Sequence, residues 1–200
     1  MTGTATVLLI RHAAHGQLGR VLSGRTPDLA LSEQGLAQAE ALAERLSSAG
    51  LDVVQSSPLL RARQTADALA RRCGTGTAIM DGLQEIDFGG WTGRNFADLE
   101  DDAGWQHWNS ARAVAIPPGG EAMTGVQGRV MAHLRETALR HAGQVIAMVS
   151  HCDVIRAAIA GILGLPLDHV LRFDINPASI SRVVVGDWGA RVMSMNEEAG

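Results

Sequence analysis

Four basic side chains stand where buried strands or helices are expected to begin or end. Arg11 and His12 directly follow one short apolar run, and His151 directly follows another. Arg61 lies in the first turns of a predicted helix. In a parallel sheet the carboxyl ends of the strands share one edge, where ligands bind. We expect the four side chains to converge there on a phosphoryl dianion, because guanidinium groups and helix N-termini both stabilise such an anion.

An imidazole held among these groups can carry out the chemistry itself. A neutral imidazole nitrogen attacks phosphorus and forms a covalent phospho-enzyme, which water then hydrolyses. Arg11 and Arg61 favour the neutral form of His12, because a neighbouring positive charge lowers the pKa of an imidazole. The same guanidiniums offset the charge of the transition state, as a magnesium ion does in other phosphoryl-transfer sites. The sequence thus predicts a metal-independent phosphohydrolase with His12 as the phosphoryl acceptor.

The leaving alcohol needs a proton, and Glu85 is the predicted donor. A carboxyl group beside a bound dianion has a raised pKa, so it can stay protonated and act as an acid. After the first half-reaction the ionised carboxylate can take a proton from water. Asp87 is the rival acid, and Glu85 is preferred for its position in the motif given below.

The segments that must position these groups alternate between strands and helices. The predicted strands are 6–10, 53–55, 78–80, 144–149, 170–173, 180–185 and 191–195, and the predicted helices are about 32–50, 57–73, 96–102, 105–109, 121–141 and 154–163. Ser57 is the expected N-cap of its helix, with Pro58 at the first helical position. This alternation predicts a mostly parallel sheet covered on both faces. The last two strands are expected to pair antiparallel.

Short motifs carry a resemblance across nearly the whole chain. They are LIRH at 9–12, SGRTPD at 23–28, LSEQG at 31–35, SSPLLRARQTA at 56–66, LQEIDFGGWTG at 83–93, PPGGE at 117–121 and VSH at 149–151. In type and order they resemble the motifs of the histidine phosphatase superfamily, the phosphoglycerate-mutase-like proteins. An Arg-His pair alone arises by chance, whereas this many motifs in register are specific.

The resemblance implies a three-layer α/β/α fold, with His12 as the phosphate acceptor and Glu85 as the proton donor. It also implies a phosphate pocket made of Arg11, Arg61 and His151, with no metal and no other cofactor. The expected substrate is a small phosphorylated molecule.

The chain departs from the family pattern close to both histidines. Ala13 and Cys152 stand where the family usually has glycine. Many relatives carry an asparagine several residues after the nucleophile that contacts phosphate. Here either Gln17 takes its place or the contact is absent.

Further substrate contacts are predicted around the phosphate pocket, at Ser23, Gly24, Arg25 and Cys152. Arg25 is either a contact to the non-phosphate part of the substrate or an ordinary loop residue. His15 is either a loop residue or a substrate contact. Cys152 is a poor nucleophile candidate, since a cysteine-dependent phosphatase loop needs an arginine six positions later, where this chain has alanine.

Length, net charge and composition limit the kinds of protein that this chain can be. A length of 200 residues suits a single domain, 1–200, and residues 87–120 are expected to form a lid-like insertion over the site. The formal net charge of −4 argues against nucleic-acid and membrane partners. No apolar run approaches the roughly 20 residues of a membrane span, and no signal-peptide pattern opens the chain, so we expect a cytoplasmic protein. The two cysteines are expected to be free thiols, and the oligomeric state is open.

Two other functions fit the same residues. A phosphomutase of the phosphoglycerate mutase type would return the phosphoryl group to a substrate, and such enzymes tend to be longer, with more cover over the site. The moderate cover expected here favours hydrolysis. A non-catalytic module that binds or senses a phosphorylated ligand is the second alternative, suggested by Ala13 and the missing asparagine.

Overall fold

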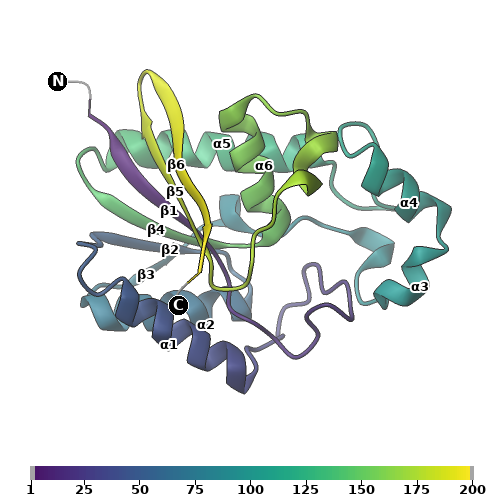
Figure 1. Ribbon diagram of the computed structural model, residues 1–200, viewed down its shortest axis with the longest axis horizontal. Helices are drawn as coiled ribbons and strands as arrows, with labels where there is room; N and C mark the ends of the chain where they lie inside the picture. Colours follow the sequence, from purple (N-terminus) through teal and green to yellow (C-terminus); the bar gives the residue numbers. More distant parts are fainter. Residues whose placement is uncertain (1–2, 199–200) are drawn as a thin grey trace.

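Six strands form one sheet in the computed structural model, which describes residues 3–198 (Figure 1). The strands are β1 (Ala5–Arg11), β2 (Val53–Ser56), β3 (Thr77–Ile79), β4 (Val145–Ser150), β5 (Ile180–Gly186) and β6 (Gly189–Glu197). Their order is β3-β2-β4-β1-β5-β6. The first four strands are parallel, while β5 runs antiparallel to both β1 and β6. The prediction of a mostly parallel sheet ending in an antiparallel pair is confirmed.

The central strand β1 is apolar at consecutive positions because both of its faces are buried. Val7 and Leu9 belong to one hydrophobic cluster, and Leu8 and Ile10 belong to the cluster on the opposite face. Successive side chains of a strand point to opposite faces, so a strand covered on both sides has no polar positions to alternate with.

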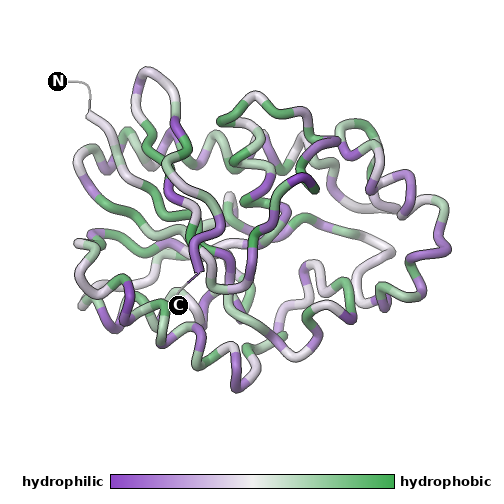
Figure 2. The backbone as a smooth tube through the Cα atoms, in the orientation of Figure 1, coloured by the Kyte–Doolittle hydropathy of each residue, from purple (hydrophilic) through white to green (hydrophobic). Residues whose placement is uncertain are grey.

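Helices cover both faces of the sheet, which gives three layers (Figure 1). The long helices are α1 (Glu33–Arg45), α2 (Leu60–Cys73), α5 (Met123–Arg140) and α6 (Cys152–Leu163). Helices α1 and α2 pack on one face, and α5 and α6 pack on the other. In Figure 2 hydrophobic residues follow the central strands, whereas α1 alternates between hydrophilic and hydrophobic residues. The three-layer α/β/α fold implied by the resemblance is confirmed.

Smaller elements lie between these layers and beyond the strand ends. They are η1 (Asp81–Leu83), η2 (Gly89–Trp91), α3 (Phe96–Glu100), α4 (Ala103–Ser110) and η3 (Leu167–Arg172). Figure 1 shows α3 and α4 projecting away from the sheet. Their aromatic side chains pack together, and Trp108 is fully buried. Among residues 3–198, no helix combines the length and the apolar character needed to cross a bilayer.

Two local predictions are wrong. Residues 170–173 do not form a strand but end the 3₁₀ helix η3, where Leu167 and Val170 are buried together at the three-residue spacing of that helix. Ser57 does not cap α2, which begins at Leu60 after the extended Leu59. Its hydroxyl instead bonds a histidine, as described below.

Candidate active site

The carboxyl ends of β1 and β4 place the two histidines side by side. His12 follows β1 and donates its backbone N–H to the carbonyl of Ser150 at 2.9 Å. His151 follows β4 and stands at the N-cap position of α6. The imidazole centroids are 5.0 Å apart and meet edge to face.

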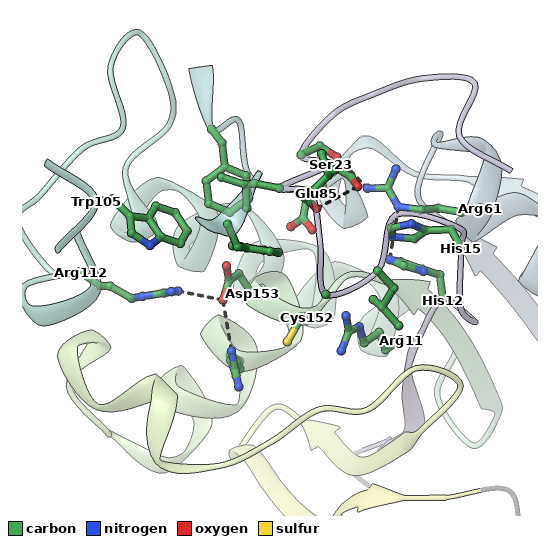
Figure 3. Close-up of a pocket in the computed structure, with 18 residues that line it drawn as sticks. Arg11, His12, His15, Ser23, Arg61, Glu85, Trp105, Arg112, Cys152 and Asp153 are labelled. Atoms are coloured by element: carbon green, nitrogen blue, oxygen red, sulfur yellow. Dashed lines mark hydrogen bonds and ion pairs between the residues drawn. The ribbon is translucent and has the colours of Figure 1, made fainter. Parts of the chain in front are cut away.

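Arg61 joins the two histidines. It lies in the first turn of α2, is 1% exposed, and donates from Nε to Nε2 of His12 at 3.3 Å. Its Nη2 lies 3.3 Å from Nδ1 of His151 and donates to the carbonyl of Gly24 at 2.7 Å. Arg11, His12 and Arg61 line one cavity (Figure 3), whereas His151 contacts Arg61 but does not line the cavity; the structure thus brings the four predicted basic side chains to one place.

One carbonyl oxygen fixes the tautomer of His12. The Nδ1 atom lies 2.8 Å from the carbonyl oxygen of Ala13, which can only accept a hydrogen bond. Nδ1 therefore carries the proton, and the lone pair is on Nε2. That atom faces Arg61 and the cavity, so it is the nitrogen available to attack phosphorus.

Burial and positive charge keep both imidazoles neutral. Burial, followed by the charges of Arg61 and Arg11, lowers the pKa of His12 well below its ordinary value. Burial and then Arg61 lower the pKa of His151 in the same direction. Without an anion both histidines are therefore uncharged at neutral pH, which is the state that a nucleophilic imidazole requires.

Ser57 orients His151, whereas the sequence predicted that it would cap a helix. Its Oγ lies 2.7 Å from Nε2 of His151, and both side chains are fully buried. Because Arg61 donates to Nδ1, His151 carries its proton on Nε2 and donates it to Ser57. Nothing in the local sequence indicates this pair, since 94 residues separate its members.

Glu85 lies against the same cluster. Its side chain is 11% exposed, and Oε2 is 3.7 Å from Nδ1 of His151. Burial, followed by the negative charge of Asp153, raises the pKa of Glu85 to about 7. The carboxyl is therefore protonated in a large part of the molecules at neutral pH, as a general acid must be.

Arg25 holds the backbone of Glu85. Its Nε donates to the Glu85 carbonyl at 2.8 Å, and its Nη2 donates to Glu121 at 2.9 Å. Arg25 does not line the cavity. Its observed contacts are therefore with the segment that carries the proposed acid.

A cavity of about 400 Å³ opens beside the histidines (Figure 3). Of the other predicted substrate contacts, Ser23, Gly24 and Cys152 line it. Gln17 does not, and its side-chain oxygen accepts a hydrogen bond from Ser23 at 3.1 Å. His15 also lines the cavity, with its ring centroid 5.4 Å from that of His12.

The two departures from the family glycines are accommodated. Ala13 is fully buried in the cluster under α1 and α2, and its N–H donates to Thr65 at 3.0 Å. Its backbone has no left-handed conformation that would require glycine. Burial and then the charge of Asp153 raise the pKa of Cys152 to about 11, so its thiol stays protonated and is a poor nucleophile.

Three further polar residues line the far end of the cavity. They are Arg112, Asp153 and Arg156. Arg112 is 4% exposed and donates a hydrogen bond to Asp153 at 2.8 Å. No cluster of three or more His, Cys, Asp or Glu side chains suited to a metal ion occurs within 3–198.

Known proteins resemble this chain over most of its length. The pattern of the histidine phosphatase superfamily (branch 1) matches residues 7–198. The chain is 31% identical over 194 residues to phosphoserine phosphatase 1 of Hydrogenobacter thermophilus, covering 95% of this chain and 91% of the relative. It is 32% identical over 181 residues to the probable phosphoglycerate mutase GpmB of Salmonella paratyphi B, covering 88% and 83%.

A solved structure has a similar fold. The mycobacterial glucosyl-3-phosphoglycerate phosphatase superposes with a TM-score of 0.87 at 26% identity, covering 98% of this chain and all of that one.

Proposed function

The chain belongs to the histidine phosphatase superfamily, and on that premise we propose that it hydrolyses phosphomonoesters through a phosphohistidine on His12, without a metal ion. One observation supports this above the others: Arg61 donates to Nε2 of His12 and also lies 3.3 Å from His151, so one guanidinium ties the nucleophile to the rest of an anion pocket. The relatives that are named phosphatases support the same reaction class.

In the first half-reaction a phosphoryl group enters the pocket of Arg11, Arg61 and His151. The N–H of Arg61 turns from His12 to a phosphoryl oxygen, which frees the lone pair on Nε2. Nε2 attacks phosphorus and the ester P–O bond breaks, with its electron pair going to the leaving oxygen. Glu85 gives that oxygen its proton.

In the second half-reaction the ionised Glu85 takes a proton from water, and the water oxygen attacks phosphorus. The P–N bond breaks, and its electrons return to Nε2 of His12 as inorganic phosphate forms. The guanidiniums balance the charge of both transition states, which is the work that a metal ion does elsewhere.

The direct test is hydrolysis of p-nitrophenyl phosphate in the presence of a chelator. We expect activity in the wild type and a loss of at least about 10³-fold in His12→Ala, because the covalent route disappears. His107→Ala is the matched control, since that histidine is exposed and does not line the cavity. Equal rates in the wild type and His12→Ala would refute the enzyme hypothesis, and abolition by the chelator would refute metal independence.

A phosphomutase is the second candidate function, and the similarity to a probable phosphoglycerate mutase favours it. A mutase would return the phosphoryl group to a second position of a substrate. Product analysis with 3-phosphoglycerate separates the two: hydrolysis releases inorganic phosphate in step with substrate loss, whereas a mutase yields an isomer without phosphate release.

The region 87–120 serves in this proposal as a lid that shields the phospho-enzyme. Phe88, Phe96, Trp105 and Arg112 support the idea, because all four come from this region and line the cavity. We also propose a cytoplasmic location, small phosphorylated molecules as substrates, and no nucleic-acid or membrane partner. The net charge of −4 supports these last assignments.

A further inference from the structure

The cavity has a second end that the phosphoryl chemistry does not use. Arg11, His12 and Arg61 lie at one end, and Trp105 and Arg112 lie at the other (Figure 3). Its volume of about 400 Å³ falls in the range of roughly 300–1,000 Å³ typical of sites for small organic ligands. A phosphoryl group bound at the first end leaves the second end free, so this end faces the leaving group.

Asp153 is the central polar group of the second end. It lies in the first turn of α6, and its side chain is 13% exposed. Its Oδ1 accepts a hydrogen bond from Nη1 of Arg112 at 2.8 Å and lies 3.7 Å from Nη1 of Arg156. Both guanidiniums therefore meet the same carboxylate oxygen.

The other oxygen, Oδ2, receives no hydrogen bond from any residue in the range 3–198. It is not one of the buried polar atoms that lack a partner, so it is open to the cavity that Asp153 lines. In Figure 3 it points away from Arg112.

The carboxylate of Asp153 is ionised. Burial raises its pKa, but the charges of Arg112 and Arg156 outweigh burial and hold the pKa below the ordinary value. An ionised carboxylate oxygen only accepts hydrogen bonds, so the group that it meets in the cavity must be a donor.

We infer that Oδ2 of Asp153 accepts a hydrogen bond from a hydroxyl of the leaving group, and that the preferred substrates are phosphomonoesters of sugars or other polyols. The inference rests on the proposed phosphatase function. On this inference Asp153 selects among leaving groups, whereas His12 carries out the phosphoryl transfer that all substrates undergo.

The charges around Asp153 favour a hydroxyl over an ammonium group. Arg11, Arg112 and Arg156 bring three cations to the cavity, against the carboxylate of Asp153 and the carboxyl of Glu85, whose pKa is raised to about 7. A positively charged leaving group is repelled there, whereas a hydroxyl both donates to the carboxylate and accepts from a guanidinium.

Trp105 adds an apolar wall suited to a carbon ring. It is half-buried, lines the same end, and is held edge to face against Trp91 at a centroid distance of 5.4 Å. A rigid aromatic surface beside a hydrogen-bonding pair can pack on the C–H face of a sugar while its hydroxyls bond the charged groups.

The test compares leaving groups that carry hydroxyls with one that carries none. We would measure kcat/KM for glucose 6-phosphate, ribose 5-phosphate and glycerol 3-phosphate against cyclohexylmethyl phosphate, whose leaving alcohol also needs a proton. We expect the best polyol to exceed the hydroxyl-free ester by about 10- to 100-fold, as a hydrogen bond to a charged group predicts. In Asp153→Asn this ratio should fall toward one.

Asp174→Asn is the matched control. Asp174 is 82% exposed and lies 3.6 Å from Arg156, but it does not line the cavity. Its removal takes a carboxylate from the same guanidinium and should leave the ratio unchanged. The wild-type ratio also tests the inference without any substitution, so a poorly folded variant does not decide it.

Three results would overturn the inference. The first is a wild-type enzyme that prefers the hydroxyl-free ester. The second is a ratio that Asp153→Asn does not change, and the third is a stronger, Asp153-dependent preference for phosphoethanolamine, which would assign the carboxylate to an ammonium group. In each case hydrolysis that depends on His12 leaves the proposed function standing. If no ester is hydrolysed in a His12-dependent way, the proposed function fails and this inference falls with it.

Discussion

At the scale of single residues, the site depends on groups that are buried and kept uncharged. His12 is oriented by the Ala13 carbonyl and neutralised by its surroundings, so its Nε2 is ready to attack before any substrate arrives. Glu85 is shifted the opposite way, toward the protonated acid. The same burial that disfavours an imidazolium also disfavours a carboxylate, so one buried pocket prepares both a nucleophile and an acid.

Replacing Glu85 with glutamine should slow only the substrates that need an acid. For an alkyl phosphate we expect kcat to fall by about 10²- to 10⁴-fold, because the alkoxide must then leave without a proton. For p-nitrophenyl phosphate the phosphorylation step should be little affected, since p-nitrophenolate is a good leaving group. Steady-state rates and pre-steady-state bursts with the two substrates give the measurement. An equal loss of burst rate for both would contradict the role of acid.

The raised pKa of Glu85 also predicts the alkaline side of the pH profile. With an alkyl phosphate, kcat/KM should decline as the pH rises above about 7, because Glu85 loses the proton that it must donate. His12 is already neutral far below this pH, so its titration adds no step near pH 6.5. Profiles of the wild type and Glu85→Gln measure the effect, and an unchanged alkaline limb in the variant would assign that limb to another group.

At the scale of elements, α1 is docked against the loop that follows His12. Gly35 lies in its first turn, and a Cβ built there would stand 1.8 Å from the carbonyl oxygen of Ala14. That carbonyl accepts the N–H of Ser32, whose side chain in turn caps the helix by accepting from Gly35. The glycine of the LSEQG motif is thus required by a close backbone approach rather than by an unusual φ angle.

Gly35→Ala should therefore lower the free energy of unfolding by about 2–3 kcal/mol or more, because a backbone carbonyl cannot move aside as a side chain can. Gly128→Ala is the matched control in α5, where a new Cβ meets nothing within 4 Å. That change should stabilise the protein by about 0.5–1 kcal/mol. Urea denaturation midpoints measure both, and a neutral Gly35→Ala would show that the α1 contact is looser than the structure has it.

At the scale of the whole molecule, one anion would bridge elements from both layers of helices. Arg61 comes from α2 on one side of the sheet, His151 stands before α6 on the other, and Arg11 and His12 come from the strand between them. In the proposed pocket an occupant would contact all three layers at once. Binding should stabilise the fold as a unit.

Inorganic phosphate should accordingly raise the melting temperature of the wild type. At one hundred times its dissociation constant, a ligand that binds only the folded state contributes about 2.7 kcal/mol. Arg61→Ala should show no phosphate-dependent shift, whereas Arg63→Ala, exposed on the same helix, should keep it. Calorimetry or a dye-based melt provides the measurement, and a shift retained in Arg61→Ala would place the anion elsewhere.

Patterns in the sequence were enough to predict the sheet, its two covered faces and which residues gather at the centre of the candidate site. Strands buried on both sides are continuous apolar runs, and a fold that is parallel at its centre puts the residues after those runs on one edge. Arg11, His12, Arg61 and His151 could be grouped for that reason. These features depend on local patterns, which the order of the residues records directly.

The contacts between segments far apart in the chain could not be predicted in this way and are known from the folded structure. Ser57, the expected helix cap, bonds His151, and Arg112 pairs with Asp153, which is 41 residues away in the sequence. Arg25 bonds the backbone of Glu85 and does not line the cavity. Such pairs are set by how packed elements face one another, and hydrophobic periodicity and capping signals carry no information about that geometry.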